Sequence, residues 1–451
     1  VINAASPSVL TMVGATPLTA GTCSATAYTV ATQDAFGNTS QVGGNTALTL
    51  SGAGAGSFYG SAGCAAGAIS SVTVTGGQSE TWFYFKNNTA QTVTLASNTG
   101  GFTQATKGVT INPDTPSVLG LAGQGTITAG ACSAAAFTVS TNDGFGNASN
   151  VGENTTMTLS GAGAGSFYAT AGCGAGTITN VTVSTGQSAA NFYYKNNSVE
   201  TVTLAAASGG FSSSTKVLAV NAAGVTVLAL TGPSPLTAGT CSAIAYTVTT
   251  KDDFGNTANV GSDTGVTMSG GGAGAFYGTA GCGAGAISSV TVANGQSAAT
   301  FYFKDNSAQS VTLAAQSGVL TSGSRAVVID PASPTVLALA GASPLTAGTC
   351  SATAYTVTTK DAFGNVSNVG GTTSLTLSGA GAGSFYGTAG CGAGAVSSVS
   401  VTGGQSQATF YYKNDVAQAV TLASDSGGFS QSSVAVTVNA ATPTVLALAG
   451  A

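Results

Sequence analysis

The sequence predicts an all-β chain made of successive β-sandwich domains, and three observations support this prediction. Apolar and polar residues alternate with a period of two over short runs, as in half-buried strands, and no helical period is sustained. Clusters of Gly, Asn and Ser separate these runs, as expected of turns. The whole pattern recurs every 109 residues and is present in four copies, so the fold predicted for one copy applies to all four.

The cysteines and one short motif define the repeat. Cysteines occur at positions 23, 64, 132, 173, 241, 282, 350 and 391, so paired cysteines are 41 residues apart and corresponding ones 109 apart. The motif D-x-F-G-N begins at Asp34 and recurs with the same offset at Asp143, Asp252 and Asp361. Four immunoglobulin-like repeats are therefore expected at residues 7–115, 116–224, 225–333 and 334–442.

The residues outside the four repeats continue the same pattern. The segment Asn3–Pro7 matches Asn439–Pro443, which lies four periods later. We therefore expect residues 1–6 to be the end of a preceding repeat. Residues 443–451 are expected to be the first strand of a following one, carried by Val445–Leu448.

About seven strands are expected in each repeat. In the first repeat they are centred on Val9–Val13, on Thr26, Tyr28 and Val30, and on the pairs Leu48/Leu50, Val72/Val74, Phe83/Phe85, Val93/Leu95 and Val109/Ile111. The inward residues of the second strand are expected to recur as Ala135, Phe137 and Val139, and as Ile244, Tyr246 and Val248. Seven short strands in about 100 residues are typical of an immunoglobulin-like sandwich. The predicted fold is a tandem array of four such domains.

The charge and histidine content exclude several functions. Charged residues make up 5% of the chain, against about 25% in typical domains. Nine Lys and Arg residues cannot form the cationic stripe that nucleic acid requires. The absence of His removes the commonest general base and metal ligand. We therefore expect no enzyme activity, no cofactor and no nucleic-acid partner. Apolar runs are too short for a membrane-spanning helix, so we also expect no membrane insertion of this segment.

Two cysteines per repeat at a fixed spacing favour one disulfide within each repeat, formed in an oxidising compartment. A closed loop of about 42 residues stabilises a domain by about 4 kcal/mol in the chain-entropy model. Buried free thiols are the alternative, whereas a metal site is disfavoured because the chain has no C-x-x-C motif and no His. The expected pairs are Cys23–Cys64, Cys132–Cys173, Cys241–Cys282 and Cys350–Cys391.

The D-x-F-G-N motif has the composition of a turn, since Asp and Asn bond to the nearby backbone and Gly allows a positive φ. An ion site is the alternative, but calcium needs six or more oxygen ligands and the acidic residues are few. A lysine also recurs after an aromatic triplet, at Lys86, Lys195, Lys304 and Lys413. It is expected to be solvated or to pair with the aspartate of the turn. An isopeptide bond to an Asn is the alternative.

One aromatic strand carries a candidate contact surface. Phe83 corresponds to Phe in all four repeats and is expected to point inward, so its neighbours in the sequence point outward. The residues of this candidate contact surface are Trp82, Tyr84, Tyr193, Tyr302 and Tyr411.

Several runs within the repeats resemble a known family. The runs TAGTCSATAYTV, DAFGN, LTLSGAGAGSFY, SVTV and GQSQATFYYKN resemble the bacterial Ig-like tandem repeats of secreted and cell-surface proteins, in the style of the Big-type repeats of invasin and intimin. The resemblance covers all four repeats. It implies an extracellular or bacterial cell-surface location, and domains strung together as an adhesin stalk or fibre.

The sequence therefore predicts a non-enzymatic extracellular structural protein, a disulfide-linked segment of a bacterial surface fibre, stalk or adhesin. The alternative is a repetitive module that binds glycan or matrix through the outward tyrosines. Because each repeat has a net charge near −1, we also expect self-association, or contact with continuing repeats, through an edge strand or the tyrosine row. A host or matrix surface is the other expected partner.

Overall fold

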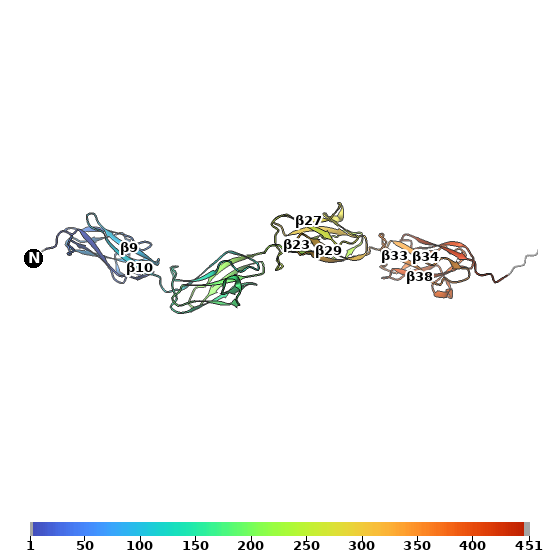
Figure 1. Ribbon diagram of the computed structural model, residues 1–451, viewed down its shortest axis with the longest axis horizontal. Helices are drawn as coiled ribbons and strands as arrows, with labels where there is room; N and C mark the ends of the chain where they lie inside the picture. Colours follow the sequence, from blue (N-terminus) through green and yellow to red (C-terminus); the bar gives the residue numbers. More distant parts are fainter. Residues whose placement is uncertain (1–2, 446–451) are drawn as a thin grey trace, which may run out of the picture. The chain divides into compact units, whose positions relative to one another are not determined.

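The computed structural model describes residues 3–445 (Figure 1). The chain divides into two compact units, of which the first ends at Ala223 and the second begins at Gly224. Each unit holds two of the 109-residue repeats, and the regular structure is β-strand apart from four short 3-10 turns. Of the strand expected at Val445–Leu448, residues 446–448 lie outside the described residues.

Each repeat contains ten strands and one 3-10 turn, in the same order. Those of repeat 1 are β1 (Val9–Val13), β2 (Leu18–Thr19), β3 (Tyr28–Gln33), β4 (Thr46–Ser51), β5 (Ser57–Tyr59), η1 (Ala62–Cys64), β6 (Ala68–Ile69), β7 (Ser71–Val74), β8 (Glu80–Lys86), β9 (Gln91–Asn98) and β10 (Ala105–Asn112). Those of repeat 2 are β11 (Val118–Ala122), β12 (Thr126–Thr128), β13 (Phe137–Asn142), β14 (Thr155–Ser160), β15 (Ser166–Tyr168), η2 (Ala171–Cys173), β16 (Thr177–Ile178), β17 (Asn180–Val183), β18 (Ala189–Lys195), β19 (Glu200–Ala207) and β20 (Ser214–Asn221).

The second unit repeats this order. The elements of repeat 3 are β21 (Val227–Thr231), β22 (Leu236–Thr237), β23 (Tyr246–Lys251), β24 (Thr264–Ser269), β25 (Ala275–Tyr277), η3 (Ala280–Cys282), β26 (Ala286–Ile287), β27 (Ser289–Val292), β28 (Ala298–Lys304), β29 (Gln309–Gln316) and β30 (Gly323–Asp330). The elements of repeat 4 are β31 (Val336–Ala340), β32 (Leu345–Thr346), β33 (Tyr355–Lys360), β34 (Thr373–Ser378), β35 (Ser384–Tyr386), η4 (Ala389–Cys391), β36 (Ala395–Val396), β37 (Ser398–Val401), β38 (Gln407–Lys413), β39 (Ala419–Asp425) and β40 (Ser432–Asn439).

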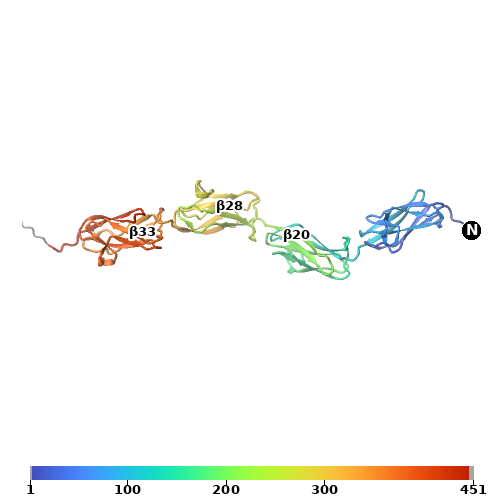
Figure 2. The ribbon, with the colours of Figure 1, turned by 180° about the vertical axis from the view of Figure 1, so that it is seen from behind.

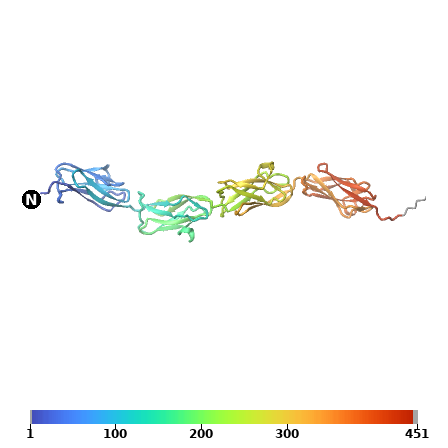
Figure 3. The ribbon, with the colours of Figure 1, turned by 45° about the horizontal axis from the view of Figure 1, so that its top comes forward.

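In every repeat the strands form two five-stranded sheets that enclose one core (Figures 2 and 3). The sheets of repeat 1 have the orders β1-β3-β8-β5-β6 and β2-β10-β9-β4-β7. All strand pairs are antiparallel except β2 with β10, which are parallel. This is the two-sheet sandwich that the alternating pattern predicts.

The seven strands expected from the pattern are β1, β3, β4, β7, β8, β9 and β10 of repeat 1. The three further strands are short, at two residues for β2 and β6 and three for β5. Such lengths are too short for an alternating pattern to show. Their pairing with longer neighbours completes both sheets.

The expected start of the second strand was wrong. Thr26, Ala135 and Ile244 were expected to point inward, but all three are exposed. The strand begins two residues later, at Tyr28 in repeat 1, because the preceding residues form a bend after the cysteine. Apolar character at one position before a strand does not by itself place that position in the core.

Aromatic rings form the centre of each core. In repeat 1 the ring of Tyr28 stacks on Phe83 at a centroid distance of 5.4 Å, and Phe58 meets Phe83 edge-on at 5.2 Å. These are the offset-stacked and edge-to-face arrangements that aromatic pairs prefer. Gly14 lies against the Tyr28 ring, where a Cβ would come within 2.0 Å of a ring carbon. A side chain at position 14 would therefore displace the central ring.

Candidate functional site: the junction between consecutive repeats

The carboxylate of the D-x-F-G-N motif forms the expected turn. In repeat 1, Asp34 Oδ1 accepts the backbone N–H groups of Phe36 and Asn38, each at 2.9 Å. The Asn38 side-chain amide donates to the Asp34 carboxylate at 3.0 Å. The turn is therefore held by donors that the motif itself supplies.

The same carboxylate fixes the linker that precedes repeats 1, 2 and 4. Asp143 Oδ2 accepts the N–H of Asp114 at 3.0 Å, and the Ser149 hydroxyl donates to the Asp114 carbonyl. In repeat 4, Asp361 Oδ2 accepts the N–H of Ala332 at the same distance. Both linkers are therefore bonded to the repeat that follows them.

These hydrogen bonds stabilise the ionised form of buried aspartates. The Asn38 amide, with the backbone N–H groups around it, lowers the pKa of Asp34 to about 2 despite burial of the carboxylate. Burial would raise the pKa of Asp143, but the Asn147 amide and three backbone N–H groups together lower it. The acidic residue of each turn therefore needs no cation as a partner.

The last residue of the motif reaches into the preceding repeat. The Asn147 Nδ2 group donates to the carbonyl oxygen of Asn88 at 2.8 Å, and Asn147 Oδ1 accepts the N–H of Ala90 at 2.8 Å. Asn88 and Ala90 belong to the turn between β8 and β9 of repeat 1. One side-chain amide thus bonds to the backbone of repeat 1 at two points, in the way that a paired strand would.

The second unit contains the same arrangement between repeats 3 and 4. The Asn365 Nδ2 group donates to the carbonyl oxygen of Asn306 at 2.8 Å, and Asn365 Oδ1 accepts the N–H of Ala308 at 2.9 Å. The two junctions therefore share their hydrogen bonds, position for position.

The phenylalanine of the motif adds an apolar contact. The Phe145 ring lies so close to Gly21 that a Cβ at this glycine would be 2.2 Å from two ring carbons, and Phe363 lies against Gly239 in the same way. Gly21 also has a φ of +77°, which favours glycine. The exposed fraction of Phe145 and of Phe363 is 48% and 47%, against 85% for Phe36. Covering more than a third of a phenylalanine surface contributes roughly 1–2 kcal/mol.

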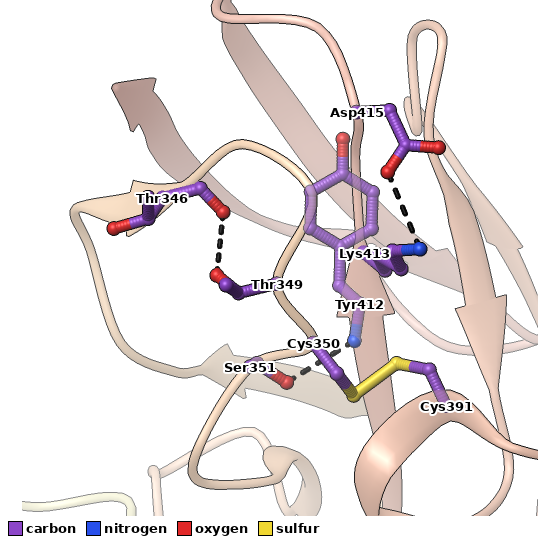
Figure 4. The surroundings of a disulfide bond; sticks show 8 residues. All are labelled: Thr346, Thr349, Cys350, Ser351, Cys391, Tyr412, Lys413 and Asp415. Atoms are coloured by element: carbon purple, nitrogen blue, oxygen red, sulfur yellow. Dashed lines mark hydrogen bonds and ion pairs between the residues drawn. A yellow bond between two sulfur atoms is a disulfide. The ribbon is translucent and has the colours of Figure 1, made fainter. Parts of the chain in front are cut away.

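A disulfide braces the segment that receives the ring. The N–H of Gly21 donates to the carbonyl oxygen of Asn87 at 2.9 Å. Two residues later, the backbone of Cys23 forms an isolated antiparallel β-bridge with Lys86 of β8. Cys23 is bonded to Cys64, at the end of η1. Figure 4 shows the equivalent bond of repeat 4, between Cys350 and Cys391. The disulfides are Cys23–Cys64, Cys132–Cys173, Cys241–Cys282 and Cys350–Cys391.

The recurring lysines do not pair with the aspartates of the turns. Among residues 3–445 the one ion pair joins Lys413 Nζ to Asp415 Oδ1 at 3.3 Å (Figure 4). Of the two expected states of these lysines, pairing with the turn aspartate does not occur in repeats 1, 2 and 4, because N–H donors already occupy the aspartate oxygens there. No cluster of three or more His, Cys, Asp or Glu residues suited to a metal ion occurs in the described part of the chain. Within the same part, no helix has the length and apolar character to cross a membrane.

The candidate contact surface is only partly open. Trp82 is 57% exposed, whereas Tyr84, Tyr193, Tyr302 and Tyr411 are half-buried. Each of these tyrosines lies opposite a second one on the neighbouring strand. The pairs are Tyr59 with Tyr84, Tyr168 with Tyr193, Tyr277 with Tyr302 and Tyr386 with Tyr411.

The sequence contained a signal of the junction that the turn interpretation did not use. Asp34 and Gly37 explain the turn, but turn chemistry does not require a Phe at its tip. An exposed Phe in all four repeats is therefore a sign of a contact outside the turn.

No protein-family model matches the chain, and no curated protein matches it. Among solved structures, the Escherichia coli adhesin FdeC matches at 14% identity, over 73% of this chain and 100% of that chain, with a TM-score of 0.34. Invasin, a bacterial integrin-binding protein, matches at 13% identity, over 96% of this chain and 79% of its own, with a TM-score of 0.32. Domains 1–6 of the surface-layer protein SbsC match at 15% identity, over 96% and 55%, with a TM-score of 0.24. At these values the function has to be inferred from the chain's own residues.

Proposed function

We propose that this chain is a structural segment of an extracellular bacterial stalk, fibre or adhesin, in which repeat 1 is held to repeat 2, and repeat 3 to repeat 4, in a fixed geometry. The observation that carries the proposal is the junction, where one Asn and one Phe of the following repeat contact the preceding repeat. A chain of domains with unstructured linkers would need neither residue.

The linkers support the same proposal. Asp143 bonds the linker before repeat 2, and Asp361 bonds the linker before repeat 4. Because the linker is fixed to the following repeat and Asn147 is fixed to the preceding one, bending breaks hydrogen bonds. The four disulfides are consistent with an oxidising, extracellular compartment.

Electron microscopy of single molecules tests this proposal. The angle between repeats 1 and 2, and between repeats 3 and 4, is expected to have a narrow distribution in the natural chain. Replacing Asn147 and Asn365 together by Ala is expected to widen it. Equally broad distributions of this angle in the natural chain and in the double variant would contradict a stalk of fixed geometry.

The second candidate function is binding of glycan or matrix through the outward tyrosines. The observation in its favour is the tyrosine pair on each repeat, such as Tyr59 beside Tyr84. A glycan array probed with the whole chain decides between the two. Saturable binding that is lost when both tyrosines of every pair become Ser would favour the binding module, whereas a stalk predicts no saturable binding.

A further inference from the structure

The linker before repeat 3 differs in sequence from the linkers before repeats 2 and 4. Residues 112–116 (NPDTP) and 330–334 (DPASP) both have proline at their second and fifth positions. Residues 221–225 (NAAGV) contain no proline. Proline fixes its own φ at about −65° and restricts the residue before it to extended conformations. Two prolines therefore restrict four of the five residues in each of the other linkers, whereas no residue is restricted in this way before repeat 3.

The same linker has glycine at its fourth position, where the other two have Thr115 and Ser333. Neither a positive φ nor a close contact requires glycine there. The φ of Gly224 lies outside the left-handed region, and no heavy atom beyond its chain neighbours lies within 4 Å of its Cβ position. What glycine does supply at this position is the widest range of backbone conformations of any residue.

A side-chain hydrogen bond to the linker is also lost in repeat 3. In repeat 2 the Ser149 hydroxyl donates to the carbonyl oxygen of Asp114, and repeats 1 and 4 contain the same bond. The corresponding residue of repeat 3 is Ala258. Its N–H donates to the carbonyl oxygen of Thr250, as that of Ser149 does to Thr141, so the backbone is placed alike. Because alanine has no hydroxyl, the linker before repeat 3 cannot receive this bond.

The two ends of this linker are anchored, which places any pivot between them. Asn221 is the last residue of β20, and Val225 packs against the core of repeat 3. The boundary between the two compact units falls between Ala223 and Gly224. Residues 222–224 are therefore the segment in which the backbone can rotate without disturbing either sandwich.

We propose that residues 222–224 form a hinge between two stiff pairs of repeats, so that the angle between repeats 2 and 3 varies more than the angle within either pair. The inference rests on the proposed stalk, whose fixed junctions are the reference for this comparison. Repeat 3 retains Phe254 and Asn256 of the motif, so the difference lies in the linker and in Ala258. Such a hinge lets one pair turn with respect to the other while the junction contacts within both pairs stay closed.

Distances between spin labels on noncanonical residues test the proposal in the whole chain. Labels at positions 191 and 300 span the linker before repeat 3, and labels at the corresponding positions 82 and 191 span the linker before repeat 2. The 191–300 distance distribution is expected to be at least twice as broad as the 82–191 distribution.

One variant gives the linker before repeat 3 the two prolines and the serine bond of the linker before repeat 2: Ala222→Pro, Val225→Pro and Ala258→Ser. It is expected to narrow the 191–300 distribution at least twofold, because the linker is then restricted and bonded like its counterpart. The matched control changes the same two linker positions without restricting φ: Ala222→Ser and Val225→Thr. It is expected to leave the distribution broad.

Narrow distributions for both label pairs in the natural chain would overturn the hinge and leave the proposed stalk intact. A 191–300 distribution that the proline variant leaves unchanged, or that the control narrows equally, would also overturn it. A broad 82–191 distribution in the natural chain would contradict the stalk and the hinge together, since the hinge requires stiff pairs.

Discussion

The ring of Phe145 occupies the space that a side chain on Gly21 would need. The two residues belong to different repeats, and each has a second reason for its identity. Gly21 has a positive φ, and Phe145 is the tip of a turn held by Asp143. The contact between repeats 1 and 2 therefore uses two residues, Gly21 and Phe145, that each local backbone conformation already places at the surface of its repeat.

Replacing Gly21 by Ala is expected to break the junction between repeats 1 and 2. The change places a methyl group against the Phe145 ring and adds the cost of a left-handed backbone, about 1–2 kcal/mol. Gly348→Ala is the matched control, since it carries the same backbone cost without a ring nearby. Amide exchange at Ala90, whose N–H bonds to Asn147, is expected to accelerate in the first variant and to stay unchanged in the second. Equal protection of Ala90 in both would contradict the contact.

Asn87 and Gln91 leave two buried donors without acceptors in repeat 1. The corresponding pairs in repeats 2 and 3 are matched, whereas in repeat 4 the buried Gln418 amide likewise has no acceptor. In repeat 2, Asn196 donates to Glu200 at 2.7 Å, and in repeat 3 a Gln side chain donates to Asp305 at 2.7 Å. Repeat 1 combines the two donors and has neither acceptor.

Gln91→Glu is therefore expected to stabilise repeat 1, because the new carboxylate accepts the Asn87 amide. A satisfied buried donor is worth about 1–2 kcal/mol. The control is Gln309→Glu in repeat 3, which places a carboxylate beside Asp305 and is expected to destabilise by a similar amount. Hydrogen exchange of peptides from β8 and β28 measures each repeat within the whole chain. The same sign for both variants would contradict the pairing.

Stability is expected to be flat from pH 5 to 8 and to fall at both extremes. The pKa of Asp34 is lowered to about 2 by the Asn38 amide, so its contribution is present above the unfolded value near 4 and is lost as pH falls toward 2. Burial raises the pKa of Tyr28 to about 12, so its contribution is present below pH 10 and is lost as pH rises toward 12. Thermal unfolding from pH 2 to 12 checks both limits. A sharp transition between pH 5 and 8 would count against this account, because the chain has no His.

The disulfides are expected to shorten the extension of each repeat under force. Of the 109 residues in a repeat, the 41-residue span between paired cysteines stays closed, which leaves about 68 to extend. At about 3.4 Å per residue, one unfolding step is then about 230 Å, and about 370 Å after reduction. Single-molecule pulling of the whole chain, with and without reductant, measures both. Steps of the same length in the two conditions would show that the bonds are absent.

The sequence predicted much of the fold and little of the junction, for a physical reason. Alternation placed β8 and its inward Phe83, because one face of a strand is buried and the other is not. It did not predict strand β2, because two residues are a single period of the apolar–polar alternation and cannot show that the pattern repeats. Asn147 was missed because its turn role and its contact role use different atoms of the residue, and the turn alone explains Asn in the motif. Only the position of the preceding repeat reveals the second role.

The most direct test of the fixed junction is the distance distribution between spin labels on noncanonical residues at positions 82 and 191, which correspond in repeats 1 and 2. A single narrow distance is expected in the natural sequence, and a broad one when Phe145 and Asn147 are both replaced by Ala. The same two substitutions at Phe36 and Asn38 are the control and are expected to leave the distribution narrow. A broad distribution in the natural sequence, unchanged by the Phe145 and Asn147 substitutions, would contradict the account.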